Sequence, residues 1–313
     1  MKVHVDNVDP ASRSGPNSFA FRLTTELVKR GHTVALDSGK DADVSLIFIE
    51  PSGRQLAKRT VQRLDGIWFA PDEFHHKNSN IKQIYHQADH VIWQSQFDRN
   101  MTTTWWGSPR EGSVVSNGAS NSYKKFDAVE AQMGLLREKH EKIFVCSANW
   151  HPQKRLKDNI RLFRHLKTHY PTACLIVMGS NGHNGGESDV YVVGNQPHDV
   201  CMQVFEASDW MLHLAWLDHC PNTVVESLSV GTPVICTEDG GTREIVGDYG
   251  IVLREDVKYN YELKDYDSPP PIDVTQVGIL PSKNDLGDHP DLSIETSASN
   301  YIRIFEDLLK KIP

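Results

Sequence analysis

Short apolar segments alternate with longer amphipathic segments along most of the chain. The apolar segments have the length of strands that are buried on both faces, as in parallel sheets. We expect strands at 2–5, 33–36, 44–49, 66–70, 90–93, 113–116, 143–146, 174–178, 190–193, 210–214, 233–236 and 251–253. We expect helices from 17 or 18 to 30 and at 81–87, 156–169, 199–207, 223–230, 242–246 and 296–310.

The alternation of strands and helices occurs twice, which predicts an α/β protein with two doubly wound, Rossmann-like domains. A length of 313 residues fits two domains of ordinary size. We assign residues 1–120 to the first domain and 140–295 to the second, with the polar stretch 119–140 as the bridge. Residues 255–295 are acidic and proline-rich, and we expect a loop there rather than core.

Composition excludes several classes of protein. Asp and Glu number 41 against 33 Lys and Arg, which gives a net charge of −8 and argues against a nucleic-acid partner. The chain has no run of 18 apolar residues, so we expect no membrane span, although peripheral membrane contact is compatible with the sequence. The five cysteines form no Cys-x-x-Cys pair, which favours a reducing, cytoplasmic compartment.

The most informative motif places two carboxylates, Asp218 and Glu226, with seven residues between them. A turn separates them, and the second lies about one turn into an expected helix. The motif is followed by a Gly-Thr-Pro-Val strand start at 231–234 and by a Gly-Gly-Thr turn at 240–242. Backbone N–H groups at a helix start bind phosphate, and a carboxylate accepts hydrogen bonds from sugar hydroxyls. The motif therefore indicates a phosphorylated ligand at the strand ends of an open sheet.

These residues resemble the carboxylate–seven–carboxylate motif of family-four glycosyltransferases, which are retaining enzymes. Asp218 stands where the family commonly has Glu, and it is one methylene shorter. Residues 147–156 resemble the family's Gly-Arg-x-x-Pro-x-Lys-Gly segment, with Pro152 and Lys154 matching and Asn149 in place of Arg. Segments at 63–66, 88–95 and 117–118 are similar to those of phage and viral members.

The resemblance implies a GT-B fold, in which two Rossmann-like domains face a cleft and the last helix, about 296–313, returns to the first domain. It implies transfer of a sugar from a nucleotide-diphosphate sugar to a carbohydrate or glycoconjugate hydroxyl, without a metal or a further cofactor. The donor would bind mostly to the second domain and the acceptor mostly to the first.

Roles for individual residues follow from the resemblance as hypotheses. Lys154 would balance the charge of the leaving diphosphate, Asp218 would position the donor sugar, and Glu226 would bind the ribose hydroxyls. The remaining donor-binding candidates are Gly15, Asn149, Pro221, Asn222, Thr223, Gly240, Gly241 and Thr242. Asp65 is a candidate catalytic base, with His75 or His76 as alternatives. Arg155 or Arg243 could supply the charge that Asn149 lacks.

Two other functions stay open at this level. Asn149 and the short Asp218 side chain would suit a non-catalytic nucleotide-sugar-binding subunit, and a nucleotide-sugar epimerase of the same fold is the other alternative. The histidine pairs 86/90 and 165/169 fit one helix face each, but neither has an adjacent Glu or a clear third ligand. We therefore expect no metal site.

Overall fold

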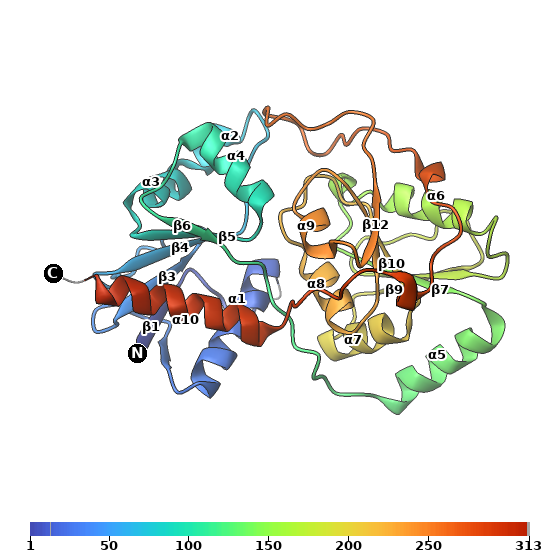
Figure 1. The fold of residues 1–313 in the computed structure, drawn as a ribbon, viewed down its shortest axis with the longest axis horizontal. Coiled ribbons are helices and arrows are strands. Elements are labelled where there is room, and N and C mark those ends of the chain that lie inside the picture. The colour runs from blue at the N-terminus through green and yellow to red at the C-terminus, as the bar shows by residue number, and fades with distance from the viewer. Residues whose placement is uncertain (13, 312–313) are drawn as a thin grey trace. The chain divides into compact units, whose positions relative to one another are not determined.

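A computed structural model of the chain describes residues 1–12 and 14–311. It contains two compact units, each built around one six-stranded parallel sheet (Figure 1). The first unit comprises Met1–Ala119, Tyr261–Lys264 and Leu292–Pro313, and the second comprises Ser120–Asn260 and Asp265–Asp291. Two parallel α/β sheets with helical crossovers confirm the predicted fold class.

The first sheet has the strand order β2-β1-β3-β4-β5-β6, and all neighbouring strands are parallel. Its strands are β1 (Lys2–Asp6), β2 (Thr33–Ala35), β3 (Val44–Phe48), β4 (Thr60–Leu64), β5 (His90–Trp93) and β6 (Gly112–Val114). The helices of this unit are α1 (Gly15–Lys29), α2 (Phe74–Lys77), α3 (Ser79–Gln87), α4 (Gln96–Trp106) and α10 (Ile294–Lys310).

Helix α10 returns to the first unit and lies beside α1 (Figure 1). Its Tyr301 and Phe305 are buried in the same core as Phe19 of α1. Outside the core, the guanidinium of Arg30 donates to the Ser299 hydroxyl at 2.7 Å and to the Glu295 carbonyl at 2.9 Å. Residues 312–313 of the predicted last helix lie outside the described residues.

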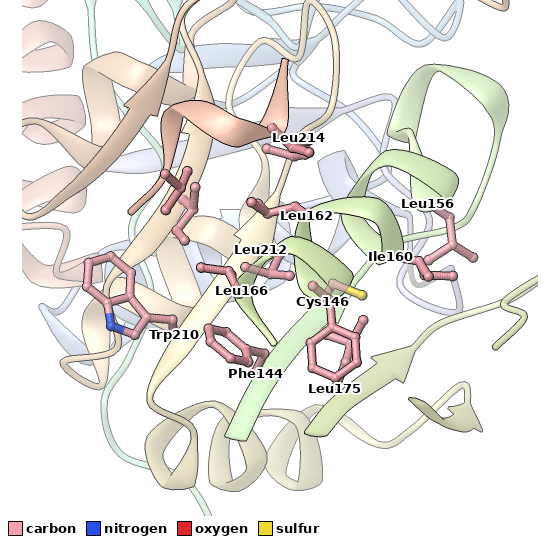
Figure 2. Close-up of a cluster of buried hydrophobic side chains, with 14 of the residues drawn as sticks. Phe144, Cys146, Leu156, Ile160, Leu162, Leu166, Leu175, Trp210, Leu212 and Leu214 are labelled. Atoms are coloured by element: carbon pink, nitrogen blue, oxygen red, sulfur yellow. The ribbon is translucent and has the colours of Figure 1, made fainter. Parts of the chain in front are cut away.

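The second sheet has the order β12-β11-β10-β7-β8-β9, again with parallel neighbours only. Its strands are β7 (Ile143–Ser147), β8 (Cys174–Met178), β9 (Val190–Gly194), β10 (Trp210–His213), β11 (Val234–Thr237) and β12 (Gly250–Leu253). Its helices are α5 (Asp127–Lys139), α6 (Leu156–Leu166), α7 (His198–Ala207), α8 (Asn222–Ser229) and α9 (Thr242–Val246), with short 3-10 helices η1 (Pro152–Lys154), η2 (Val274–Gln276) and η3 (Lys283–Asp285). Figure 2 shows Phe144 of β7, Leu162 of α6 and Leu212 of β10 in one buried cluster of this unit.

The predicted strand at 66–70 is wrong, and the strand of this region is β4. Gly66 has a φ of +115°, and the backbone of Trp68 bonds to the Asn78 side chain instead of a neighbouring strand. Strand β4 carries Gln62 and Arg63, whose side chains are buried. The apolar pattern missed this strand because it contains these two polar residues, whose buried side chains donate hydrogen bonds to distant parts of the chain.

Two long helices were also missed. Helix α4 follows β5 and is capped by Ser95, which accepts from Asp98 N–H. Helix α5 occupies most of the expected bridge at 119–140, although Met133 is its one buried residue. Acidic residues in its first turn and basic residues in its last turn support it electrostatically, so a weak apolar stripe was sufficient.

The proline-rich region contributes to the core of the second unit, contrary to expectation. Ile272, Val274, Val277 and Leu280 are buried in the same cluster as α6. Residues 261–264 of this region belong to the first unit, where the Trp105 indole donates to the Tyr261 carbonyl at 2.7 Å. None of the helices among the described residues has the length and apolar character needed to cross a membrane.

Candidate functional site

Most of the predicted site residues lie in three loops of the second unit or in the helices that directly follow these loops, at one edge of its sheet. Strands β7, β10 and β11 are parallel neighbours, so their carboxyl ends lie together. The loops that follow them span 148–155, 214–221 and 238–241. This edge is where open α/β sheets bind their ligands.

Hydrogen bonds join the three loops to one another. Trp216 N–H donates to the Gln153 carbonyl at 2.9 Å, and the Gln153 side chain donates to the Trp216 carbonyl at 3.1 Å. Gly241 N–H donates to the Asp218 carbonyl at 2.7 Å. Gly240 has a φ of +120°, and an added Cβ would lie 2.9 Å from the Asp218 carbonyl oxygen. A glycine is therefore required where the third loop approaches the second.

The charged centre of these loops is an ion pair between Lys154 and Asp218. Lys154 Nζ lies 2.5 Å from Asp218 Oδ2, and the Asp218 side chain is 12% exposed. His213 Nε2 lies 3.5 Å from the same oxygen. Burial alone would raise the pKa of Asp218, but the Lys154 charge and the His213 ring outweigh it and hold the pKa below its usual range. Asp218 is thus an anion at neutral pH.

The second carboxylate oxygen of Asp218 is available for a ligand. Within the described part of the chain, Oδ1 has no hydrogen-bond partner, because both contacts use Oδ2. One oxygen can therefore anchor Lys154 while the other accepts a hydrogen bond from a bound hydroxyl.

Helix α8 presents the second carboxylate of the motif. Pro221 is its N-cap, Asn222 and Thr223 form its half-exposed first turn, and Glu226 is buried in the second turn. Glu226 Oε1 lies 3.7 Å from His198 Nδ1 of α7. The start of α8 directly follows the loop that carries Asp218. The N–H groups at the start of this helix therefore lie in the same part of the site as the carboxylates of the motif, and they can bind an anionic ligand there.

Thr242 begins α9 beside the glycine pair. Its side chain is buried, and Oγ1 makes no hydrogen bond with any of the described residues. A buried hydroxyl without a protein partner fits a residue that bonds to a bound molecule. Gly240 and Gly241, which precede it, are buried as well.

Arg155 cannot supply the charge that Asn149 lacks, although the sequence suggested it. Its guanidinium is buried and forms a two-pronged pair with Glu255, at 2.8 and 3.2 Å, and it donates to the Pro270 carbonyl at 2.7 Å. The residue holds the proline-rich region against the sheet. Arg243 is exposed on α9, and Asn149 is exposed and accepts a hydrogen bond from the Ser180 hydroxyl.

Asp65 lies in the first unit, in a polar network at the ends of three neighbouring strands. Arg63 at the end of β4 contacts the Asp65 carboxylate and donates to Asn117 Oδ1 at 2.6 Å. Gln94, just after β5, donates to Asp65 Oδ1 at 2.8 Å and accepts from Asn117 at 3.0 Å. The Arg63 guanidinium also lies over the rings of Phe19 and Phe48, at 4.3 and 4.8 Å from their centroids. The Asp65 carboxylate is therefore fixed rather than mobile.

Gly15 is the first residue of α1, the helix that follows β1, and it is exposed. It belongs to the first unit, as do Asp65 and the alternative bases His75 and His76, which are exposed on α2. The predicted donor-binding residues from Asn149 to Thr242 belong to the second unit. Among residues 1–12 and 14–311, no group of three or more His, Cys, Asp and Glu side chains is arranged to hold a metal.

Sequence reasoning missed His213, the last residue of β10. The available signal was its position, because it is a polar residue at the carboxyl end of an apolar strand. Gln94 and Asn117, which follow β5 and β6, lie in the segments 88–95 and 117–118 that the resemblance had already singled out.

The fold and the strand-end site define a GT-B protein, and solved structures of this architecture match almost the whole chain. HepE from Anabaena, in complex with UDP and glucose, has a TM-score of 0.65 at 14% identity, and the match covers 98% of this chain and 100% of the HepE chain. Sucrose-phosphate synthase from Thermosynechococcus elongatus has a TM-score of 0.68 at 12% identity and covers 100% of both chains. A glycosyltransferase from Rickettsia africae ESF-5 has a TM-score of 0.64 at 12% identity and covers 99% of both.

Residues 130–258 match the sequence family Glycosyl transferases group 1. The matched residues contain the whole three-loop site, and the match identifies the chemistry of this site as that of a glycosyltransferase. No curated protein matches the chain in sequence. The GT-B fold and the glycosyltransferase function predicted from the motif are confirmed.

Proposed function

We propose that this glycosyltransferase moves a sugar from a nucleoside-diphosphate sugar, held at the three-loop site, to a hydroxyl of a carbohydrate or glycoconjugate. Retention of the anomeric configuration is part of the proposal. The observation that carries it is the contact between Lys154 and Asp218 at the carboxyl ends of the strands. It places a cation beside a carboxylate that has one oxygen left to bind a ligand. UDP-glucose is the first donor to try, because the HepE structures contain UDP, glucose or UDP-glucose.

The chemistry requires negative charge to be stabilised as the diphosphate leaves. Lys154 is held at a defined place, since η1 is fixed to the loop after β10 by the paired bonds of Gln153 and Trp216. A preorganised cation of this kind stabilises the charge that develops in the transition state. The backbone at the start of α8 and the Thr242 hydroxyl would hold phosphate and sugar oxygens beside it.

The two carboxylates would bind different parts of the donor. Asp218 Oδ1 would accept a hydrogen bond from a sugar hydroxyl while Oδ2 keeps its contact with Lys154. Glu226, on the second turn of α8, would accept from the ribose hydroxyls. A helix carboxylate suits this task because ionised oxygens accept two hydroxyl hydrogen bonds at once.

The acceptor would bind to the first unit, on the loop after β4. Trp68 is 40% exposed there, and Lys77 Nζ lies 3.9 Å from its ring centroid. The buried side chain of Asn78 accepts from Trp68 N–H at 3.1 Å and donates to the Trp68 carbonyl at 2.5 Å. An exposed indole on a clamped backbone is a rigid platform for a sugar ring. The role of Asp65 as the catalytic base stays a prediction.

Calorimetry with UDP, together with mass analysis of products from UDP-glucose, tests the proposal. Wild-type protein should bind UDP, and acceptor mass should increase by one sugar residue during turnover. Glu226→Ala should weaken UDP binding by about tenfold or more, since one ionic hydrogen-bond acceptor contributes on the order of 1.5–3 kcal/mol. Trp68→Ala is the matched variant in the other unit, and it should keep the UDP affinity while transfer falls.

The same measurements separate the alternatives. A donor that changes into an isomer of equal mass would indicate the epimerase, and UDP binding without transfer or donor hydrolysis would indicate the binding subunit. Unchanged UDP affinity in Glu226→Ala would remove this residue from the donor site.

A further inference from the structure

His213 occupies a position that none of the proposed donor contacts uses. It is the last residue of β10, directly before the loop that carries Asp218, and it is 4% exposed. Its Nε2 lies 3.5 Å from Asp218 Oδ2, the oxygen that Lys154 contacts at 2.5 Å. Two groups able to carry positive charge therefore face one buried carboxylate oxygen.

The two contacts differ in quality. The Lys154 contact is a short ion pair, whereas 3.5 Å is too long for a good hydrogen bond, and His213 Nε2 makes no other with the described residues. A buried ring nitrogen without a close partner is costly. The arrangement leaves room for the His213 contact to shorten when the Lys154 contact weakens.

The surroundings of His213 set its charge. Burial lowers its pKa, against the opposing effect of Asp218, so the ring is neutral at pH 7 while Lys154 is in place. On the neighbouring strand β11, Cys236 is in register with His213, and burial raises the pKa of its thiol to about 12. Asp218 and Lys154 are the charged groups that act on the ring, and they act in opposite directions: Asp218 raises its pKa and Lys154 lowers it.

We propose that His213 is a positioning residue that takes up a proton when a nucleoside diphosphate binds, and so keeps Asp218 ionised and in place. The inference rests on the proposed function. A diphosphate that pairs with Lys154 draws its charge away from Asp218, which would leave a buried carboxylate uncompensated. Protonation of the neighbouring ring restores the balance, and the proton comes from the buffer, with no other bond made or broken.

The test is calorimetry of UDP binding at pH 7.5 in two buffers of different ionisation enthalpy. The difference between the two apparent enthalpies gives the protons taken up for each UDP bound. Wild-type protein should take up a substantial fraction of one proton, and His213→Gln should take up none. His140→Gln is the matched control, because His140 is another buried histidine of this unit and bonds to the Thr172 carbonyl. It should behave as wild type does.

Asp218→Asn keeps the test decisive if His213→Gln does not fold. Without a carboxylate there is no charge to compensate, so this variant should also lose the proton uptake. UDP binding without proton uptake in the wild type, or full uptake in either variant, would overturn the role of His213 and leave the proposed function standing. Failure of the wild type to bind UDP would instead overturn the proposed function, and the inference with it.

Discussion

At the scale of single residues, the contact between Lys154 and Asp218 joins two positions that are 64 residues apart in the sequence. Each was predicted from its own motif, because a charged residue after a buried strand can be recognised in the sequence alone. Their contact was not predictable in detail, because it depends on β7 and β10 being neighbours in the sheet. Arg155 shows the opposite case. It adjoins Lys154 in sequence, yet its φ of 52° turns the chain and directs its side chain to Glu255.

Lys154→Ala should reduce the turnover rate by about a hundredfold or more, because loss of one charge-stabilising group in an active site typically costs about 3 kcal/mol of barrier. Initial rates with saturating donor would measure the effect. Lys157→Ala is the matched control, since Lys157 is exposed three residues further along and should keep the wild-type rate. A near-normal rate for Lys154→Ala would exclude this residue from the mechanism.

Arg155→Met should destabilise the second unit by about 3–5 kcal/mol, because it leaves the carboxylate of Glu255 buried without its counter-charge. The double variant Arg155→Met with Glu255→Met should recover most of that loss, since hydrophobic residues can replace a buried pair at little cost. Urea unfolding followed by circular dichroism would measure both. Arg164→Met removes an exposed pair with Glu187 and should change stability by less than about 1 kcal/mol. An equal loss in the single and double variants would contradict this account.

At the scale of elements, apolar runs predicted most strands because parallel strands are buried on both faces. The missed strand β4 carries Arg63, and a buried arginine is possible there because Asn117 and two phenylalanine rings surround it. Such partners come from distant parts of the chain, so no local pattern reveals them. Helix α5 was missed for a related reason, since its position is fixed in part by the Arg137 pair with Asp209 at 2.6 Å.

The three loops of the site depend on close backbone contact, and Gly240→Ala tests this. An added Cβ would lie 2.9 Å from the Asp218 carbonyl oxygen, in a backbone conformation that L-residues rarely adopt. UDP affinity should therefore fall. Gly231→Ala is the matched control, because Gly231 also has a positive φ, of 78°, but an added Cβ would meet no atom within 4 Å. Calorimetry should show a clear loss for the first variant and little change for the second. Equal affinities would mean that the site tolerates displacement of the Asp218 loop.

At the scale of the whole molecule, three buried histidines predict sensitivity to acid. Burial lowers the pKa of His4, His90 and His213 in the folded protein below 6.5. The unfolded chain therefore binds more protons than the folded one below pH 6.5, and stability falls with decreasing pH from that point down to the folded-state pKa values. Above pH 7 these groups should contribute no slope.

Thermal unfolding between pH 5 and pH 8 measures this dependence. His4→Gln should flatten the acid side of the profile, because His4 of β1 is buried beside Ser45 of β3. An acid side of unchanged steepness in His4→Gln would contradict a contribution from this residue.

The sequence by itself determined the class of architecture, the two-fold repetition of strands and helices, and the motifs that follow individual strands. These depend on local periodicity and on the chemistry of neighbouring residues, which a linear pattern retains. Tertiary structure alone decided which strand ends are neighbours, which charges are neutralised in the interior, and that His213 faces the same oxygen as Lys154. The physical reason is that burial and pairing of a polar group depend on residues far away in the chain.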